Sequence, residues 1–285
     1  MSGGSNISFR KMNGLGNDFV VLDGRQRKIN VTQDTARSIA GRETGVGCDQ
    51  LILLDKSVFA DVRMRIWNNE GGEVESCGNA SRCIADILLK ESGADSVSVE
   101  TLGGLLKCWR SGDEMISVDM GEPRFHWSEI PLAEEFHDTR TIELQIGPID
   151  DPILHTPSAI NVGNPHAIFW VDDPEAYDLA KFGPLLENHP IFPERANISL
   201  AQVIEGTRIV LKVWERGAGL TRACGTAACA AGAAAARKGL TGRDVTVTLP
   251  GGDLRLPGGK SCPSYLDFIL NSHLHLVILM QSCGC

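Results

Sequence analysis

The sequence predicts an α/β fold of the mixed α+β kind, with two pseudo-symmetric lobes that arose by internal duplication. We expect each lobe to be a curved mixed or antiparallel sheet wrapped around a central helix. Three observations support this: one half of the chain aligns with the other, strand and helix patterns recur in the same order, and one helix is rich in small alanines. The predicted limits are residues 7–123, residues 124–258 and an atypical tail at residues 259–285.

The duplication is visible as a constant shift of 147 residues between the two halves. A repeat this long indicates two similar lobes rather than a short-period solenoid. Past a one-residue slip around Cys83 and Cys229, we expect the register to return at Thr101 and Thr248. The shift aligns Gly16-Asn17 with Gly163-Asn164, Gln50 with Asn197, Trp67 with Trp214, Gly72 with Gly219, and Cys77-Gly78 with Cys224-Gly225.

Local patterns predict the same plan in both lobes. Alternating or continuous apolar runs indicate strands, and longer runs that end in glycine indicate helices. A charged stretch from Glu129 to Thr141 lacks a strand pattern, and we interpret it as the crossing between the lobes. The expected strands are residues 19–22, 51–54, 62–67, 97–101, 116–120, 167–171, 210–215 and 245–249, and the expected helices are residues 32–42, 80–90 and 227–238.

Composition restricts the class of protein. The chain has 285 residues, of which 42% are hydrophobic and 22% are charged, as in soluble globular proteins. Its net charge of -9 argues against nucleic acid and against anionic membranes as partners, and leaves a small-molecule substrate open. We expect a cytoplasmic protein without a signal peptide. Nine irregularly spaced cysteines do not suit a disulfide framework.

Two of these cysteines, Cys77 and Cys224, are predicted to stand directly before helices at equivalent positions of the repeat. The first turn of a helix presents unpaired N–H groups and partial positive charge, which bind carboxylates and lower the pKa of a thiol. Two such helix starts that faced one another could hold a substrate carboxylate between two sulfur atoms. One thiolate would remove the α-proton and the opposite thiol would return it, which inverts a stereocentre.

A single cysteine is more often a small buried hydrophobic side chain than an acid or a base. The repeat favours the active role for Cys77 and Cys224, because both stand in the same place. Five others lack such a mate or lie within predicted elements, and we interpret them as structural: Cys48, Cys83, Cys108, Cys229 and Cys262. Cys283 and Cys285 are too close to the end of the chain to be assigned a role.

Six segments resemble the diaminopimelate epimerase family in order and spacing. That family interconverts LL- and meso-diaminopimelate, on the route to lysine and peptidoglycan, without a cofactor. The resemblance covers roughly Ile7 to Arg255. Its segments are MNGLGNDFVVLD at Met12 to Asp23, GVGCDQL at Gly45 to Leu51, ESCGNASRC at Glu75 to Cys83, GNPH at Gly163 to His166, ERANI at Glu194 to Ile198, and ERGAGLTRACGTAAC at Glu215 to Cys229.

The resemblance implies that Cys77 and Cys224 are the catalytic base and acid, with roles that exchange with the direction of reaction. It implies a diaminopimelate epimerase-like fold, no metal, no cofactor and a homodimer. Glu215 and the asparagines suit the distal ammonium, and Arg216 suits the distal carboxylate. His166 and Glu215 resemble residues that support the acid and base. The implied substrate-binding residues are Asn17, Gln50, Asn68, Gly78, Asn79, Asn164, Asn197, Glu215, Arg216, Gly225 and Thr226.

Two features depart from the family pattern. Ala80 and Ala227 replace glycines that are common in the family, a small change that preserves the backbone donors. Beyond about Leu256 the expected closing strand is missing, and Leu276 to Met280 resembles it only faintly. That strand normally completes the first lobe and contributes to the dimer interface.

Alternative functions remain open on the residues alone. A related two-cysteine racemase of proline, hydroxyproline or histidine would use the same chemistry, although Arg216 and the asparagines favour a substrate with two amino-acid ends. A noncatalytic amino-acid binding protein, or a redox protein that uses Cys77 and Cys224 as a dithiol, belongs to another class. The sequence contains no lysine motif for pyridoxal phosphate, no dinucleotide or Walker fingerprint, and no metal-spaced cluster.

Overall fold

The computed structural model describes residues 7–75, 77–111 and 115–258, and the backbone of 277–281. The chain divides into two compact units between Ile116 and Ser117, with Gln281 grouped with the first unit. Strand β8 (Met115–Asp119) contains this division. The lobe limits expected at residues 123 and 258 stay predictions. Most of the tail that begins at residue 259 lies outside the described residues.

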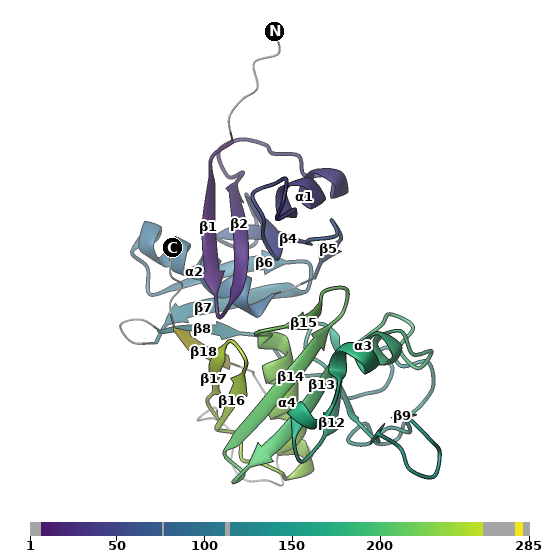
Figure 1. Cartoon of the computed structure of the whole chain (residues 1–285). Helices are drawn as coiled ribbons and strands as arrows, with labels where there is room; N and C mark the ends of the chain where they lie inside the picture. The colour runs from purple at the N-terminus through teal and green to yellow at the C-terminus, as the bar shows by residue number, and fades with distance from the viewer. Residues whose placement is uncertain (1–6, 76, 112–114, 259–276, 282–285) are drawn as a thin grey trace. The chain divides into compact units, whose positions relative to one another are not determined.

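The first unit contains one mixed sheet and two helices (Figure 1). Its strands follow the order β1-β2-β3-β4-β6-β7, and β5 pairs with β4 at the side. The pairs β2·β3 and β4·β6 are parallel and the other pairs are antiparallel. The elements are β1 (Phe9–Gly14), β2 (Asn17–Asp23), α1 (Gln33–Ala40), β3 (Gln50–Asp55), β4 (Val62–Asn68), β5 (Glu73–Val74), α2 (Gly78–Ser92), β6 (Ser96–Thr101) and β7 (Gly104–Arg110).

The sheet of the first unit curls around α2. Strands β1 and β7 stand at opposite ends of the strand order, and both contact this helix. Residues of α2 from Gly78 to Leu89 are buried, as expected for a helix enclosed by a sheet. The other face of the sheet packs Val20, Leu22 and Leu51 against Ala36 of α1. The prediction of a curved sheet around a central helix is therefore confirmed for this lobe.

The second unit repeats this plan with the sheet order β18-β17-β16-β14-β13-β12-β11 and with β15 beside β14 (Figure 1). Its short hairpin of β9 and β10 forms a separate sheet. The elements are β9 (Gln145–Ile146), β10 (Leu154–His155), β11 (Ser158–Asn161), β12 (Pro165–Trp170), η1 (Pro174–Ala176), α3 (Leu179–Glu187), β13 (Asn197–Ile204), β14 (Arg208–Glu215), β15 (Gly219–Thr221), α4 (Gly225–Lys238), β16 (Val245–Leu249), β17 (Gly252–Leu256) and β18 (Val277–Gln281).

Helix α4 occupies the centre of the second unit. It contacts β11 near one end of the sheet and β17 near the other, so this sheet also curls around its helix. Small side chains permit the close approach: a Cβ added at Gly232 would lie 2.3 Å from Leu256 Cδ1. The helix ends at Gly239, whose left-handed backbone (φ 73°) favours glycine. The alanine-rich central helix predicted from the sequence is confirmed.

The repeat holds at the level of strand register. Phe19 pairs with Gln50 in the first unit, and His166 pairs with Asn197 in the second at the same shift of 147. The predicted return to this shift after the central helices is wrong. The hairpin partner of Gly104 is Thr101, and the partner of Gly252 is Leu249, so the shift there is 148. Helix α4 is one residue shorter than α2, and the connection from its C-cap Gly239 to Leu249 is two residues longer than the one from Gly93 to Thr101, so the net change is one residue.

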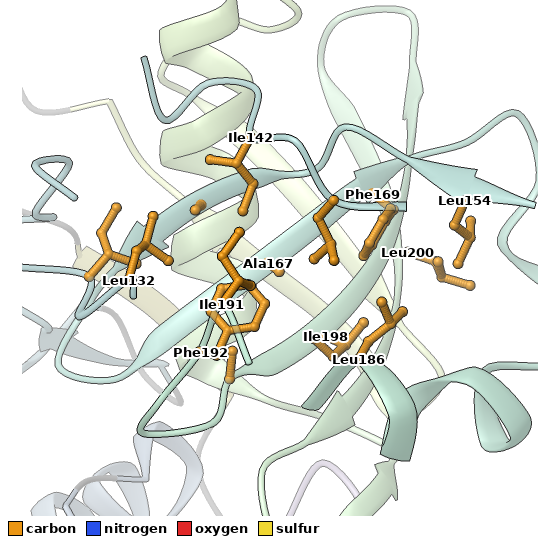
Figure 2. Close-up of a cluster of buried hydrophobic side chains, with 14 of the residues drawn as sticks. Leu132, Ile142, Leu154, Ala167, Phe169, Leu186, Ile191, Phe192, Ile198 and Leu200 are labelled. Atoms are coloured by element: carbon orange, nitrogen blue, oxygen red, sulfur yellow. The ribbon is translucent and has the colours of Figure 1, made fainter. Parts of the chain in front are cut away.

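The hydrophobic core between α3 and the sheet of the second unit also contains the segment before β9 (Figure 2). Ile130 and Leu132 are buried there with Phe169 and Leu200. The interpretation of Glu129 to Thr141 as a crossing between lobes is therefore wrong, because its spaced apolar side chains pack into this core without forming a strand. In the described part of the chain, no helix is long and apolar enough to span a membrane.

The tail contributes one described strand. The backbone of β18 pairs with β17 through Arg255 and Leu279. This strand overlaps the segment Leu276 to Met280, in which the sequence shows a faint closing strand.

Candidate active site

Cys77 is the N-cap of α2 in the first unit. Its backbone is extended (φ -148°, ψ 111°), and its carbonyl accepts the first helical hydrogen bond from Ser81 N at 2.9 Å. The side chain makes no capping hydrogen bond. A serine or aspartate at this position would normally bind the N–H groups of the first turn. A cysteine does not cap the helix in this way, and the positive end of the helix dipole makes this helix start suit an anion such as a carboxylate.

Cys224 is the N-cap of α4 and has nearly the same geometry. Its backbone is extended (φ -137°, ψ 110°), and its carbonyl accepts a hydrogen bond from Ala228 N at 3.1 Å. The sulfur lies 3.3 Å from Thr226 Oγ1. Cys224 is buried and Cys77 is partly buried, and neither is in a disulfide. The structure therefore confirms that both cysteines stand directly before helices, one in each unit.

The polar residues predicted for the first unit gather at the carboxyl side of β1 and the start of α2. Asn79 Nδ2 donates to Asn17 Oδ1 at 3.4 Å, and both side chains are buried. Gln50 lies opposite Asn68 across β3 and β4. Asn68 Oδ1 accepts hydrogen bonds from the backbone N–H groups of Glu70 and Gly72, at 3.1 and 2.8 Å. Asn68 therefore also holds the turn between β4 and β5.

A carboxylate cluster that sequence analysis missed flanks Asn17 and Gln50. Asp18 and Asp49 each accept a hydrogen bond from the other's backbone N–H, at 3.0 and 2.9 Å. Arg42 Nη2 binds both carboxylates, at 2.8 and 2.7 Å. Burial alone would raise the pKa of Asp18, but hydrogen bonds from Arg42 and Lys11 outweigh it and hold that pKa well below its usual range. The cluster joins the start of β2 to the start of β3.

Arg82 is a second residue that the sequence did not single out. It lies on α2 a little over one turn beyond Cys77, and its side chain is only 1% exposed. Burial lowers the pKa of Arg82 to about 10, although the nearby charges of Cys77 and Asp86 oppose this shift. A guanidinium in this position favours the thiolate form of the cysteine.

The polar residues predicted for the second unit lie at the ends of β12, β13 and β14. His166 Nε2 and Asn164 Oδ1 are 2.8 Å apart. Asn197 Nδ2 donates to the carbonyl of Pro165 at 3.0 Å, and Asn197 Oδ1 accepts from Arg216 N at 3.0 Å. The side chain of Asn197 therefore joins β12 to the segment that carries Glu215 and Arg216.

His166 is completely buried, and this burial, together with the charge of Arg216, lowers its pKa to about 3. The imidazole is therefore neutral at physiological pH. With Asn164 Oδ1 as the acceptor, Nε2 carries the proton and Nδ1 carries the lone pair. Within the described residues, Nδ1 has no hydrogen-bond partner.

Glu215 and Arg216 follow directly at the end of β14. Thr221 Oγ1 donates to Glu215 Oε1 at 2.5 Å, and Arg216 Nη1 donates to the carbonyl of Glu194 at 2.9 Å. Gly217 has a left-handed backbone (φ 72°), so the chain turns sharply after Arg216. The turn carries a carboxylate and a guanidinium on adjacent residues, a combination suited to a zwitterionic ligand. In the described part of the chain, no group of three or more His, Cys, Asp or Glu side chains could hold a metal ion.

Solved structures share this fold at low sequence identity. A hydroxyproline epimerase from Agrobacterium vitis with bound trans-4-hydroxy-L-proline is 15% identical, with a TM-score of 0.66 over 97% of this chain and 89% of that chain. A phenazine biosynthesis protein of the PhzF family from Bacillus anthracis is 17% identical, with a TM-score of 0.65 over 98% of this chain and 97% of that one. The chain thus has the two-lobed α+β fold of this class of proteins.

Sequence similarity gives the family within that class. The model of the family described as diaminopimelate epimerase matches residues 9–126 and 158–257. A diaminopimelate epimerase from Rhodopseudomonas palustris (strain BisB18) is 56% identical over 252 residues, which are 88% of this chain and 86% of the relative. One from Afipia carboxidovorans is 55% identical over 260 residues, 90% of this chain and 89% of the relative. The chain belongs to the diaminopimelate epimerase family.

Proposed function

We propose that this chain interconverts LL-2,6-diaminopimelate and meso-diaminopimelate by a two-base reaction of Cys77 and Cys224, without a cofactor. The observation that carries the proposal is the matched N-cap geometry of the two cysteines, one in each half of an internal repeat. Both cysteines lie within the ranges that the family model matches. The diaminopimelate epimerases compared above are more than 50% identical to this chain, whereas the hydroxyproline epimerase is 15% identical.

In the proposed reaction, the carboxylate of the reacting centre binds backbone N–H groups at the two helix starts, around Gly78-Asn79 and Gly225-Thr226. One cysteine, as the thiolate, removes the α-proton and becomes a thiol. The other thiol donates its proton to the opposite face of the carbon and becomes a thiolate. The N–H groups stabilise the negative charge that develops on the carboxylate as the proton leaves. The reverse direction exchanges the two roles.

We assign the distal end of the substrate to the polar side chains around these helix starts. Glu215, Asn164 and Asn197 suit its ammonium group, and the planar fork of Arg216 suits its carboxylate. Asn17, Gln50 and Asn68 complete the set proposed for binding. His166 and Glu215 support the acid and base, and the lone pair on a neutral His166 is consistent with such a role.

The proposed reaction assigns the chain to the synthesis of lysine and of peptidoglycan precursors in the cytoplasm. We also propose a homodimer, on the strength of the family resemblance. Light scattering coupled to size-exclusion chromatography tests this assembly, and a monomeric mass at micromolar concentration would contradict it.

Purified protein incubated with LL-diaminopimelate, without added cofactor and in the presence of a chelator, should produce the meso isomer on a chiral column. Proline, hydroxyproline and histidine in parallel reactions test the racemase alternative, and we expect no inversion of these substrates. Binding of diaminopimelate without turnover would instead support a noncatalytic binding protein. A need for reducing conditions is expected both of an epimerase with two active thiols and of a dithiol redox protein. Mass spectrometry should therefore follow the oxidation state of both cysteines during the reaction.

A further inference from the structure

Glu187, the last residue of α3, carries a buried carboxylate. The residue is only 5% exposed, and the side chain accepts three hydrogen bonds. Oε1 accepts from Gly217 N at 3.0 Å and from Arg195 Nη1 at 3.0 Å, and Oε2 accepts from Trp214 Nε1 at 2.7 Å. Burying an ionised group costs free energy, and the three donors compensate that cost. An apolar side chain would avoid the cost altogether, so the carboxylate calls for a functional explanation.

The three donors surround one short segment of the chain. Trp214 immediately precedes Glu215 and Arg216, and Gly217 immediately follows them. The third donor, Arg195, lies beside Glu194, whose carbonyl accepts from Arg216 Nη1. One carboxylate therefore fastens both ends of the Glu215-Arg216 pair and connects it to the segment that leads to Asn197.

Helix α3 is held in place for this contact. A Cβ at Gly183 would lie 2.4 Å from Trp214 Cδ2, so the helix backbone rests directly on the indole ring. This close approach places Glu187, one turn later, within reach of the indole N–H. In the first unit, the shift of 147 puts Ala40 at the equivalent position, and Ala40 is a buried apolar residue. The carboxylate is thus specific to the lobe that carries Glu215 and Arg216.

We propose that Glu187 is a positioning residue that sets the orientation of Glu215 and Arg216 toward the distal end of the substrate. The inference rests on the proposed function for the nature of the substrate, and on the three hydrogen bonds of Glu187 for the geometry. Glu187 itself is buried, and it acts on the turn through its hydrogen bonds with Gly217, Trp214 and Arg195. Its removal should weaken recognition of the distal group more than it slows proton transfer at the cysteines, in which Glu215 has only a supporting part.

The main test is the Glu187→Gln variant. A glutamine has the same shape, but its amide nitrogen cannot accept a hydrogen bond, so one of the three donors loses its acceptor. We expect KM for diaminopimelate to rise about tenfold while kcat changes by less than about threefold, as for a loss of ground-state binding. A purely structural defect would lower kcat with the folded fraction and leave KM unchanged, and that result would overturn the proposal.

The matched control is Glu175→Gln. Glu175 pairs with Lys212 in the same unit, but its side chain is 74% exposed. This variant should keep both kinetic parameters within about twofold of the parent, because exposed ion pairs contribute little. A KM increase equal to that of Glu187→Gln would show that loss of any carboxylate in this unit suffices, and would contradict the proposal.

A measurement independent of activity separates this inference from the proposed function. Amide hydrogen exchange of the peptide that contains Trp214 to Thr221 should be at least about fivefold faster in Glu187→Gln than in the parent, because a glutamine cannot accept hydrogen bonds on both sides and so holds the two ends of the turn less firmly. Unchanged exchange would contradict the role of Glu187 even if the parent epimerises diaminopimelate. Faster exchange in a protein without epimerase activity would keep the geometry and reject only the proposed substrate.

Trp214→Phe provides a second variant that retains the aromatic packing and removes one donor. Alone it should raise KM by a smaller factor than Glu187→Gln, because two donors remain on Glu187. Combined with Glu187→Gln it should add little, since the introduced amide no longer faces the indole N–H. Fully multiplicative effects of the two substitutions would contradict a shared role. If Glu187→Gln does not fold, Trp214→Phe replaces it as the test, and an unchanged KM in that variant would contradict the proposal.

Discussion

The two lobes share their backbone register but hold their site segments in different ways. In the first lobe, Asp18, Asp49 and Arg42 join the strands around Asn17 and Gln50, and the Arg42 side chain is 60% exposed. In the second lobe, the buried Glu187 takes this supporting part, and Pro165 and Ala196 occupy the positions of Asp18 and Asp49. Duplication preserved the strands and the cysteine helix starts, whereas the supporting charges diverged.

The largest expected effect is on the rate of epimerisation, and it comes from the two cysteines at equivalent positions of the lobes. Cys77→Ala and Cys224→Ala should each lower epimerisation by about 10² to 10⁴-fold, the range of a general acid or base, because neither lobe can replace the other. Cys229→Ala is the control on the same helix as Cys224. Burial raises the pKa of the Cys229 thiol far above its ordinary value, so it stays protonated, and this variant should keep its activity. Parental rates in either single variant would remove one lobe from the mechanism.

The contact between α3 and Trp214 predicts the next effect, on stability. Gly183→Ala introduces a Cβ against the rigid indole ring and should lower the free energy of unfolding by about 1–3 kcal/mol. Gly242→Ala is the control, because nothing lies within 4 Å of a Cβ at that position. Urea denaturation of both variants checks the difference. Equal stability of the two would show that α3 can shift without cost.

His166 predicts a pH effect that belongs to the second lobe alone, since Phe19 is its counterpart in the first. Its folded pKa of about 3 lies below the unfolded value of 6.5, so the unfolded chain binds the proton first. Stability should therefore fall as the pH drops below 6.5, by about 2 kcal/mol at pH 5 from this group.

Urea denaturation at pH 7.5 and pH 5.0 measures this loss, and His166→Asn should reduce it by about the same amount. An identical pH dependence in the variant would mean that the imidazole is accessible to protons in the folded protein.

The smallest effect is expected from Arg42, whose exposed side chain pairs with Asp18 and Asp49 in the first lobe. Arg42→Met should cost less than about 1 kcal/mol, because exposed ion pairs are weak and screened by salt. The cost should shrink further in 1 M salt, and KM should change less than in Glu187→Gln. A larger effect on KM than that of Glu187→Gln would reverse the contrast between the two lobes.

Much of the fold follows from local sequence patterns. The apolar strands around Val20, Leu51 and Ile66 and the alanine-rich helix before Gly239 are recognisable because their burial is periodic or continuous. The sequence does not predict helix α3, because Gly183 and Pro184 interrupt its pattern, although Gly183 is what allows contact with Trp214.

The cysteine helix starts could be predicted because the repeat marks both of them with the same short segment. The supports could not be predicted, since Glu187, Asp18 and Asp49 act through partners distant in the chain and have no counterpart in the repeat. The change of shift to 148 after α4 could not be predicted either, because similar pairs such as Thr101 and Thr248 align by chance at the wrong shift.

Isotope incorporation tests the central claim, that one thiol on each face of the carbon acts as acid or base. LL-diaminopimelate should be converted in deuterium oxide, and both isomers should be analysed by mass spectrometry at low conversion. Two single-proton thiols predict one deuterium in the meso product and none in the remaining LL substrate, because each face exchanges with its own thiol. Product that retains the original proton, or substrate that gains deuterium as fast as product forms, would contradict the account.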